Sequence, residues 1–441
     1  MVLVWCAQAV IHLCYRDFIS PRNEYAGLMF DEPGLVRMMI WNALFSLPVL
    51  LLPRTWDRPG AIILWYLYIV CFLPFGVLSL DMGKDATLAY SVVSFFIPFC
   101  LLCLLYRFWQ PKAPLQLGHI PAAFCIIVFA TIAVLGSIVM FYSFRGEIDL
   151  SLQTAYIRRL DARVTAGSRS ITAYAGAFFS QAVVPVLIAF SLTKFSFRNV
   201  AVIPGFIGAI AIFAFNGTKS TVVTPIIMVV LGLALALRWN RGWQLLSGVL
   251  VFMVTAYLLD ALYGNEFLTD IVIRRVFAVP VQLAHGYLEF YGTTGFLYFT
   301  DIGIISKMVS SPHGGRTASF IIGEDYFGIQ GLNANVGAIP YGFAELGISG
   351  SWLICGCILG LILLLDRASI SKNVRWTVPL AFAIAFRLSE QSFHTALISG
   401  GILIILAVFL FVTDDSSKSE SVPTVMPPLA PDLRRCDELR V

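Results

Sequence analysis

Two polar segments of the chain gather arginines, and the first of them has a spacing suited to an anionic ligand. It reads AYIRRLDARVTAGSRS, in which Arg159 and Arg163 lie one helical turn apart. Arg158 is similarly spaced from Asp161, with which it is able to pair. Guanidinium groups bind phosphate through two parallel hydrogen bonds, so this cluster indicates a phosphate or pyrophosphate ligand. An amphipathic helix that grips lipid headgroups has the same pattern, and both interpretations stay open.

The second segment reads IRRVFAVPVQLAHG and places Arg274 and Arg275 before an apolar stretch. Arg275 and Val279 share one face of a helix, which would set the cations above an apolar wall. Gly286 follows Arg275 after ten intervening residues. An apolar wall beneath cations suits a polyprenyl tail beneath its pyrophosphate.

Three glycine-containing pieces follow, and they read HGGRTASF, IIGEDYFG and NANVGAIPYGFAELGISG. The paired glycines before Arg316 allow the backbone to approach a ligand closely. Asn333 and Asn335 supply amide donors and acceptors suited to sugar hydroxyls. Loop turns and helix caps use the same residue types, so these pieces alone slightly favour ordinary loop chemistry.

Charged residues beside apolar runs mark further positions, because a charge near the membrane interior is costly. Lys219 lies in FNGTKST, at a short turn between two apolar runs. Arg387 and Glu390 lie in FRLSEQSFH at a spacing that also suits a structural ion pair. His313 and His394 are candidate proton shuttles, although a single histidine is more often a hydrogen-bonded structural residue.

The elements that must position these residues are strongly apolar. The chain is 58% hydrophobic and 13% charged, with a mean hydropathy of +0.82, whereas soluble domains carry about 25% charged residues. Such a chain favours a lipid bilayer, where helices satisfy their own backbone groups. The net charge of +4 gives no indication of a nucleic-acid partner. The nine cysteines have no metal-ligand spacing, and phosphate-loop and nucleophile-elbow motifs are absent, so we expect no disulfide framework, metal or cofactor.

Apolar runs of spanning length recur along the chain and predict an all-α polytopic membrane protein of about twelve helices. The predicted spans are 2–15, 35–53, 60–80, 87–106, 118–142, 172–193, 200–216, 220–237, 243–262, 337–365, 376–388 and 395–413. They form one predicted membrane domain, residues 1–413, with long connections at about 143–170 and 263–336. The Ser- and Pro-containing tail, 414–441, is predicted to be cytoplasmic and disordered.

The cations of the short connections predict the orientation. On one side, each short connection carries two or three cations next to a helix end, as cytoplasmic loops do. These cations are Arg54, Arg58, Arg107, Lys112, Lys194, Arg198, Arg238, Arg241, Arg367, Lys372 and Arg375. Both long connections then lie on the outer face. The outer connections hold at least as many cations, but many are bunched in one place, so the regularity of the short loops decides the prediction.

The second half of the chain resembles the Wzy-type O-antigen polymerases, which polymerise the repeat units of bacterial surface polysaccharides. The resemblance runs from FNGTKST to the last helix and is weaker at AYIRRLDAR. It rests on RRVFAVPVQLAHG, GGRTASF, IGEDYFG, NANVGAIPYGFAELGISG and RLSEQSFHTALISGG. The family's R-x10-G motif is matched by Arg275 and Gly286. The first segment departs from it, because Ser170 and Tyr174 stand where the glycine belongs.

The resemblance implies a GT-C-like glycosyltransferase in the bacterial inner membrane that acts at the periplasmic face without a metal. Its substrates would be undecaprenyl-pyrophosphate-linked oligosaccharides, and its partners membrane lipids and a chain-length regulator. The implied contacts with the donor pyrophosphate are Arg274, Arg275 and Arg316, and those with the other lipid-linked substrate are Arg158, Arg159 and Arg163. Further substrate-binding candidates are Lys219, Gly286, Asn333 and Asn335. The candidates for the catalytic base are Glu324, Glu390 and His313.

Two other functions remain alternatives. An O-antigen ligase would hand the chain to lipid A–core, and His313 in the large outer loop is consistent with such an enzyme. The string NANVGAIPYGFAELGISG favours the polymerase. A transporter of lipid-linked oligosaccharides would show two similar halves and charges within the spans. The sequence shows no internal repeat, and its unusual cations lie in the outer loops.

Overall fold

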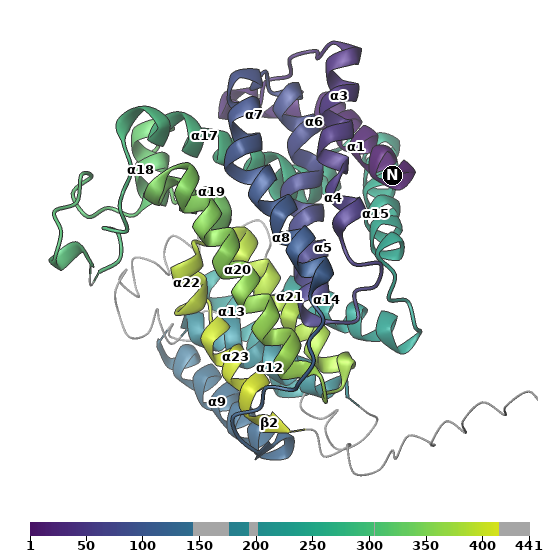
Figure 1. Cartoon of the computed structure of the whole chain (residues 1–441), viewed down its shortest axis with the longest axis vertical. Coiled ribbons are helices and arrows are strands. Elements are labelled where there is room, and N and C mark those ends of the chain that lie inside the picture. Colours follow the sequence, from purple (N-terminus) through teal and green to yellow (C-terminus); the bar gives the residue numbers. More distant parts are fainter. Residues whose placement is uncertain (144–175, 194–201, 304, 414–441) are drawn as a thin grey trace, which may run out of the picture.

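The computed structural model describes residues 1–143, 176–193, 202–303 and 305–413. The described part is mainly helical (Figure 1). The elements of the first half are α1 (Val2–Cys14), η1 (Tyr15–Ile19), α2 (Ser20–Asn23), η2 (Glu24–Ala26), α3 (Leu35–Ser46), α4 (Pro48–Leu51), α5 (Pro59–Leu67), η3 (Tyr68–Phe72), α6 (Leu73–Asp81), α7 (Asp85–Ser91), η4 (Val92–Phe96), α8 (Ile97–Phe108), β1 (Ile120–Pro121), α9 (Ala122–Ser143), η5 (Phe179–Val183), α12 (Val184–Ser191), α13 (Val202–Asn216) and α14 (Ser220–Ala236). Those of the second half are α15 (Gly242–Tyr263), α16 (Phe267–Thr269), η7 (Asp270–Ala278), α17 (Val279–Thr294), η8 (Ile305–Lys307), α18 (Ala318–Ile321), η9 (Ile322–Tyr326), α19 (Ala338–Leu346), α20 (Ile348–Ser369), α21 (Val374–Glu390), α22 (Phe393–Leu397), α23 (Ile402–Phe411) and β2 (Val412–Thr413).

Several of these helices are long and apolar enough to cross a membrane, which makes the chain a membrane-embedded helical protein. In the described part of the chain six helices meet that criterion. They are Val2–Ala26, Pro59–Asp81, Asp85–Phe108, Ala122–Val139, Gly242–Tyr263 and Ile348–Ser369. Five shorter apolar helices are Leu35–Leu51, Gly176–Ser191, Ile203–Ala214, Ser220–Ala236 and Ile402–Phe411.

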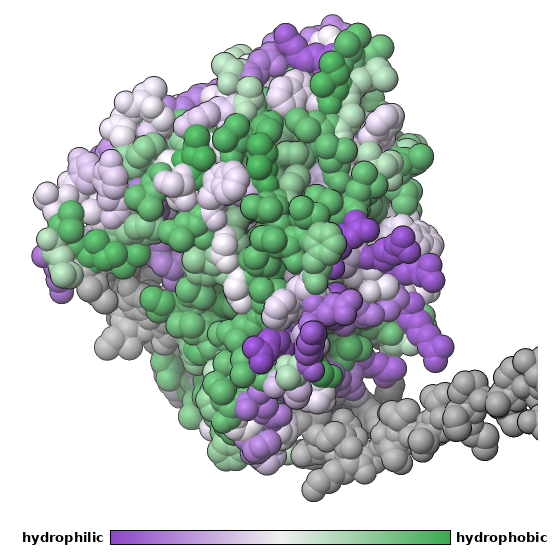
Figure 2. All heavy atoms as spheres, in the orientation of Figure 1, coloured by the Kyte–Doolittle hydropathy of each residue, from purple (hydrophilic) through white to green (hydrophobic). Residues whose placement is uncertain are grey.

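Burial separates a central helix from peripheral ones. The most apolar window of Pro59–Asp81 is 83% buried, whereas that of Ala122–Val139 is 17% buried. Both segments are apolar on all sides, so their positions in the bundle decide what they contact. The central helix packs on α21 and α20, whereas α9 leaves Phe124 and Ile127 exposed. Figure 2 shows the resulting hydrophobic band over the helices. Exposed apolar side chains of this kind are suited to contact with lipid.

A helix lies at the position of every predicted span, but two predicted single helices are interrupted. The predicted span 337–365 is wrong as one helix, because Gly347 adopts a φ of +65° and separates α19 from α20. A Cβ there would also lie 2.6 Å from the Phe296 ring. The predicted span 395–413 is divided at Gly401, with a φ of +75°, into α22 and α23. A backbone in the left-handed region favours glycine and ends a right-handed helix.

The connections predicted to be cytoplasmic lie together at one end of the bundle (Figure 1). The Trp56 amide donates to the Asn240 carbonyl at 2.7 Å, and the Leu115 amide donates to the Arg367 carbonyl at 3.0 Å. Strands β1 and β2 pair in parallel at the same end. These hydrogen bonds join four connections and agree with the predicted alternation of the chain. Lys194 and Arg198 lie outside the described residues.

The long connection 263–336 lies at the opposite end. Gln282 donates to the Ala26 carbonyl at 2.8 Å, and Lys84, in the turn after α6, pairs with Glu289 at 2.9 Å. The connection is not a simple loop, because η7 and α17 form a largely helical segment that buries Val281 and Leu288. It therefore packs as a layer over the helix ends. The region 143–170 and the tail 414–441 lie outside the described residues.

Candidate functional site

The adjacent arginines lie in the π-helical segment η7, whose start is anchored by a buried carboxylate. Asp260 is 1% exposed and accepts hydrogen bonds from the Thr269 amide at 2.7 Å and the Thr269 hydroxyl at 2.8 Å. It also accepts one from the Leu268 amide at 3.2 Å. A carboxylate that receives three donors is well satisfied even when buried. Asp260 thereby fixes where η7 leaves the end of α15.

The two arginines of η7 have different surroundings. Arg274 donates through two nitrogens to Asp270, one turn earlier, with a distance of 2.8 Å from Nη2 to Oδ2. Arg275 is exposed. The helical phase of η7 therefore places Arg275 at the surface, where it is accessible to an anionic ligand.

An apolar crevice begins immediately after η7. Pro280, Val281 and Ala284 of α17 form one wall. The other walls come from α3, α5, η3, α6, α7, η4, the stretch 336–340, α20 and the last turn of α21. The only hydroxyls on the described lining are those of Ser91 and Ser389. Pro280, Val281 and Ala284 follow Arg275 along the chain, whereas Val279, predicted to share a face with Arg275, is not among the lining residues.

Gly286, which completes the predicted R-x10-G motif, has a packing role. It is buried in α17, and a Cβ at this position would lie 3.1 Å from Cε1 of Tyr326. The Tyr326 hydroxyl in turn donates to Glu289, which pairs with Lys84. A side chain at Gly286 would push η9 away from α17. The glycine therefore allows the two helical pieces of the outer layer to approach each other.

Arg316 lies in the loop before α18, where it is held by two acids. It donates to Asp325 through both terminal nitrogens, at 2.9 and 2.7 Å, and to Glu324 at 3.4 Å. The guanidinium lowers the pKa of the Asp325 carboxyl through these hydrogen bonds. Gly314 and Gly315 both have positive φ, of 67° and 75°, so the turn before Arg316 requires the glycines noted in the sequence.

The three candidate bases lie in different surroundings. His313 packs against Phe290 and Tyr291, and its Nε2 is buried without a hydrogen-bond partner in the described structure. Glu324 accepts from Arg316 and from the Gly331 amide, which is 3.1 Å away. Glu390 lies at the end of α21, 3.8 Å from Arg387. The structure brings His313, Glu324 and Arg316 together in one loop and places Glu390 on another element.

The remaining predicted substrate contacts are scattered. Asn333 has a buried side-chain oxygen without a partner among the described residues, and Asn335 is exposed. Between them, the Ala334 carbonyl accepts from the Tyr287 hydroxyl at 3.2 Å, which ties this stretch to α17. Lys219 is exposed at the start of α14. Arg158, Arg159 and Arg163 lie outside the described residues.

Sequence reasoning missed an acidic pair where the outer layer meets α19, formed by buried Glu345 and half-buried Asp301. The Tyr341 hydroxyl donates to Asp301, and the Phe299 amide donates to Glu345 at 2.6 Å. One oxygen of each carboxyl group is buried without a partner in the part of the chain that the structure describes. Burial raises the pKa of Glu345, and the neighbouring Asp301 carboxylate raises it further. One proton held between the two oxygens would satisfy both groups.

A buried histidine on α17 was also missed as a separate feature. His285 is fully buried between the Ser79 hydroxyl, 2.7 Å from Nε2, and the Thr87 hydroxyl, 2.7 Å from Nδ1. Burial lowers the pKa of His285 to about 3, and the charge of Lys84 contributes. The neutral ring therefore joins α17 to α6 and α7. In the sequence, His285 was detectable as a polar residue on the apolar face of the segment LAHGYL.

Comparison of the whole chain with models of protein families, with curated proteins and with solved structures gives no match. These comparisons therefore give no indication of the chemistry of the site. No group of three or more His, Cys, Asp or Glu side chains within the described ranges is arranged to hold a metal ion.

Proposed function

We propose that this protein polymerises undecaprenyl-pyrophosphate-linked oligosaccharide repeat units at the periplasmic face of a bacterial inner membrane. The observation that supports the proposal most directly is the continuity between η7, which carries Arg275, and the apolar crevice lined by Pro280, Val281 and Ala284. A polyprenyl pyrophosphate has the matching chemistry, with a long apolar tail and a highly charged head. The sequence resemblance selects the reaction.

The proposed protein has twelve spans arranged in a GT-C-like fold. The six long helices, the five shorter apolar helices and α21 together supply twelve candidates among the described residues. The cation-bearing connections at one end of the bundle would be cytoplasmic, as the positive-inside rule favours. The layer formed by 263–336 would then be periplasmic, where repeat units attached to a lipid carrier are available.

In the proposed reaction, a sugar hydroxyl of one lipid-linked repeat unit attacks the anomeric carbon of the growing chain. The new glycosidic C–O bond forms as the bond from that carbon to the pyrophosphate oxygen breaks. The bonding electron pair leaves with undecaprenyl pyrophosphate, and the hydroxyl proton passes to a base. Arg275, assisted by Arg274 and Arg316, would stabilise the charge that develops on the leaving group. The base would come from Glu324, Glu390 or His313.

Arg274 and Arg316 would bind the pyrophosphate by exchanging partners, because both guanidinium groups contact carboxylates in the structure. The first arginine segment, with Arg158, Arg159 and Arg163, would hold the other lipid-linked substrate. In this division, the pyrophosphate of the donor and that of the acceptor would each be bound by a separate group of arginines. It also predicts separable defects in the binding of donor and acceptor.

An O-antigen ligase is the second candidate, because His313 presents a buried, unpartnered Nε2 within the arginine-bearing loop. The two enzymes would share the donor and differ in the acceptor. The purified full-length protein in lipid nanodiscs should therefore be supplied with a synthetic undecaprenyl-pyrophosphate repeat unit, with and without lipid A–core. A ladder of products without lipid A–core would support the polymerase. Transfer that requires lipid A–core would support the ligase, and intact substrate in both reactions would contradict both enzymes.

A further inference from the structure

The last turn of α21 carries a cation that the proposed site has not yet used. Arg387 is 4% exposed, and its Nε is buried without a hydrogen-bond partner in the described structure. Its ion-pair partner, Glu390, lies 3.8 Å from Nη1, and the side chain of Glu390 is 47% exposed. Within the described ranges, the contacts of the Arg387 guanidinium include this long ion pair and the Phe386 ring, whose centroid lies 5.1 Å away, and such contacts compensate poorly for the loss of water.

A structural role accounts for only part of this arrangement. A cation at the carboxyl end of a helix interacts favourably with the helix dipole. Leaving a buried charged donor unsatisfied costs more free energy than this interaction supplies. An ion-pair acceptor at 3.8 Å does not remove the penalty on Nε. An additional acceptor in the functional state would account for the placement of Arg387.

The neighbours of Arg387 line the apolar crevice. Leu388 and Ser389 form part of its wall, and their carbonyl groups pack closely on Gly337, which also lines it. The Ser389 hydroxyl lies 3.5 Å from the Tyr66 hydroxyl, and the charge of Arg387 acts on Tyr66. The Ser389 hydroxyl lies on this end of the crevice, and the Tyr66 hydroxyl and the Arg387 guanidinium lie next to it. All three are suited to contact phosphate oxygens.

We infer that Arg387 binds the phosphate head of an amphiphile whose apolar tail lies in the crevice. This inference rests on the proposed function, in which two lipid-linked substrates each bring a pyrophosphate. The crevice has α17, just beyond Arg275, on one side and the last turn of α21, with Arg387, on another. Arg387 therefore supplies a second cationic position along the same apolar space. The shared chemistry is an anionic phosphate on a lipid, and its source is the polyprenyl carrier.

The test measures binding of undecaprenyl pyrophosphate to the full-length protein in nanodiscs, with undecaprenol and phosphatidylglycerol as comparison ligands. Arg387→Gln should weaken undecaprenyl pyrophosphate binding by roughly ten- to hundredfold, the value of a lost charge-assisted hydrogen bond. Binding of undecaprenol should change little. Arg387→Lys should fall between the wild type and Arg387→Gln, because lysine keeps the charge and loses the two-pronged geometry.

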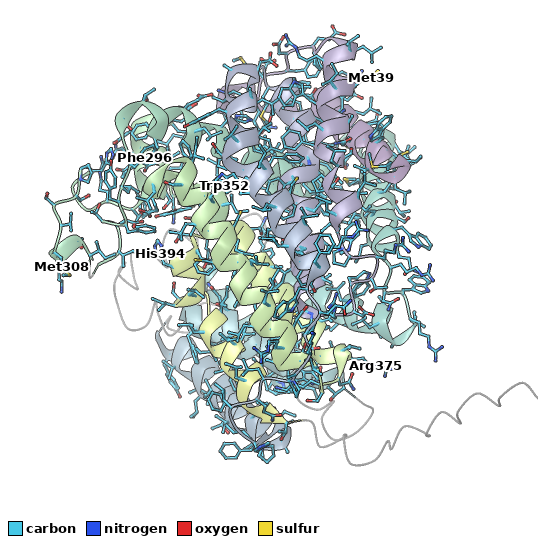
Figure 3. The ribbon with its side chains drawn as sticks, viewed as in Figure 1. Met39, Phe296, Met308, Trp352, Arg375 and His394 are labelled. Carbon is cyan, nitrogen blue, oxygen red and sulfur yellow. The ribbon has the colours of Figure 1, made fainter. Side chains whose placement is uncertain are left out.

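Arg375→Gln is the matched control, because Arg375 lies in the first turn of the same helix, at its other end (Figure 3). It should bind all three ligands as the wild type does. If Arg387→Gln does not fold, Arg387→Lys decides, and wild-type affinity in that variant would overturn the inference. Equal loss of phosphatidylglycerol binding would overturn the assignment to the carrier. Failure of the wild type to bind undecaprenyl pyrophosphate would contradict the proposed function itself.

Discussion

Replacement of Glu345 by glutamine is expected to preserve stability, whereas replacement by alanine is expected to reduce it strongly. In Glu345→Gln the amide oxygen still accepts from the Phe299 amide, and the amide nitrogen donates to the unpartnered oxygen of Asp301. The glutamine amide thus gives Asp301 a hydrogen-bond donor at every pH, whereas the wild type has one only while a proton is shared between the two carboxyl groups. Glu345→Ala removes the acceptor of the partly buried Phe299 N–H, which lowers the free energy of unfolding by about 1–3 kcal/mol. It also removes about one buried methylene, which lowers the free energy of unfolding by a further ~0.8 kcal/mol. We expect a loss of about 2–4 kcal/mol for this variant.

The pH dependence has a definite sign. Because the folded-state pKa of Glu345 is raised, the folded protein holds a proton that the unfolded chain has released. This stabilisation is complete below the ordinary glutamate pKa and is lost as the pH rises towards the raised value, at up to about 1.4 kcal/mol per pH unit. Buried His285 has the opposite dependence below about pH 6.5. Above neutral pH the slope of Glu345 is therefore separate from that of His285.

Thermal unfolding of the full-length protein in nanodiscs, followed by tryptophan fluorescence between pH 7 and 8.5, measures this slope. The wild type should lose stability as the pH rises, and Glu345→Gln should lose less, so the difference between the two proteins reports the Glu345 proton. Asp85→Asn is the control, because Asp85 forms an exposed ion pair with Arg37 at 2.6 Å and should contribute little. Equal destabilisation of the glutamine and alanine variants, or a wild type that becomes more stable at higher pH, would refute the proton-sharing pair.

Four other changes test the outer layer. Arg275→Ala should abolish product ladders at unchanged expression, and Arg275→Lys should restore them poorly; full activity in the alanine variant would remove the pyrophosphate assignment. Asp260→Ala should lower the free energy of unfolding by about 1–3 kcal/mol, as measured by denaturant titration, since it leaves the donors at the start of η7 unsatisfied. Relative to the wild type, His285→Ala should become more stable as the pH falls from about 6.5 to 5, because only the wild type must keep a buried ring neutral; a stability difference that does not change with pH would contradict a neutral buried ring. Asp325→Asn should strengthen binding of inorganic pyrophosphate, measured by calorimetry, because Arg316 loses its competing carboxylate; weaker binding would argue against partner exchange.

Sequence patterns located the helices because a span is a local property. A run of apolar residues of sufficient length satisfies its own backbone hydrogen bonds in lipid whatever its neighbours are. The breaks at Gly347 and Gly401 depend on backbone angles that an apolar run does not reveal. The helix α17 was hidden in a predicted loop, because its apolar face covers other helix ends and alternates with polar residues. Its amphipathic periodicity was nevertheless present in the sequence.

The acidic pair illustrates what local patterns omit. Asp301 and Glu345 meet only because the chain returns from the outer layer into α19, and no spacing rule links residues so far apart. Glu345 alone was detectable, since a carboxylate within FAELG contradicts its apolar surroundings. Arg387 was found by that reasoning, because it stands in an apolar helix. Isolated charges in apolar runs were thus readable from the sequence, whereas their partners required the fold.

The pairing of the arginines with nearby acids bears on turnover. Arg274 donates to Asp270 and Arg316 donates to Asp325. A pyrophosphate that replaced these carboxylates would therefore gain only the difference in free energy between the arginine–phosphate and the arginine–carboxylate hydrogen bonds. In the proposed reaction, that difference would limit the affinity for a product that leaves after every transfer. The carboxylates would also keep each guanidinium oriented before substrate arrives, which would reduce the ordering cost of binding. A site built only of unpaired arginines would bind undecaprenyl pyrophosphate more tightly and release it more slowly, so under the proposed function the acids next to the arginines would favour repeated addition over capture.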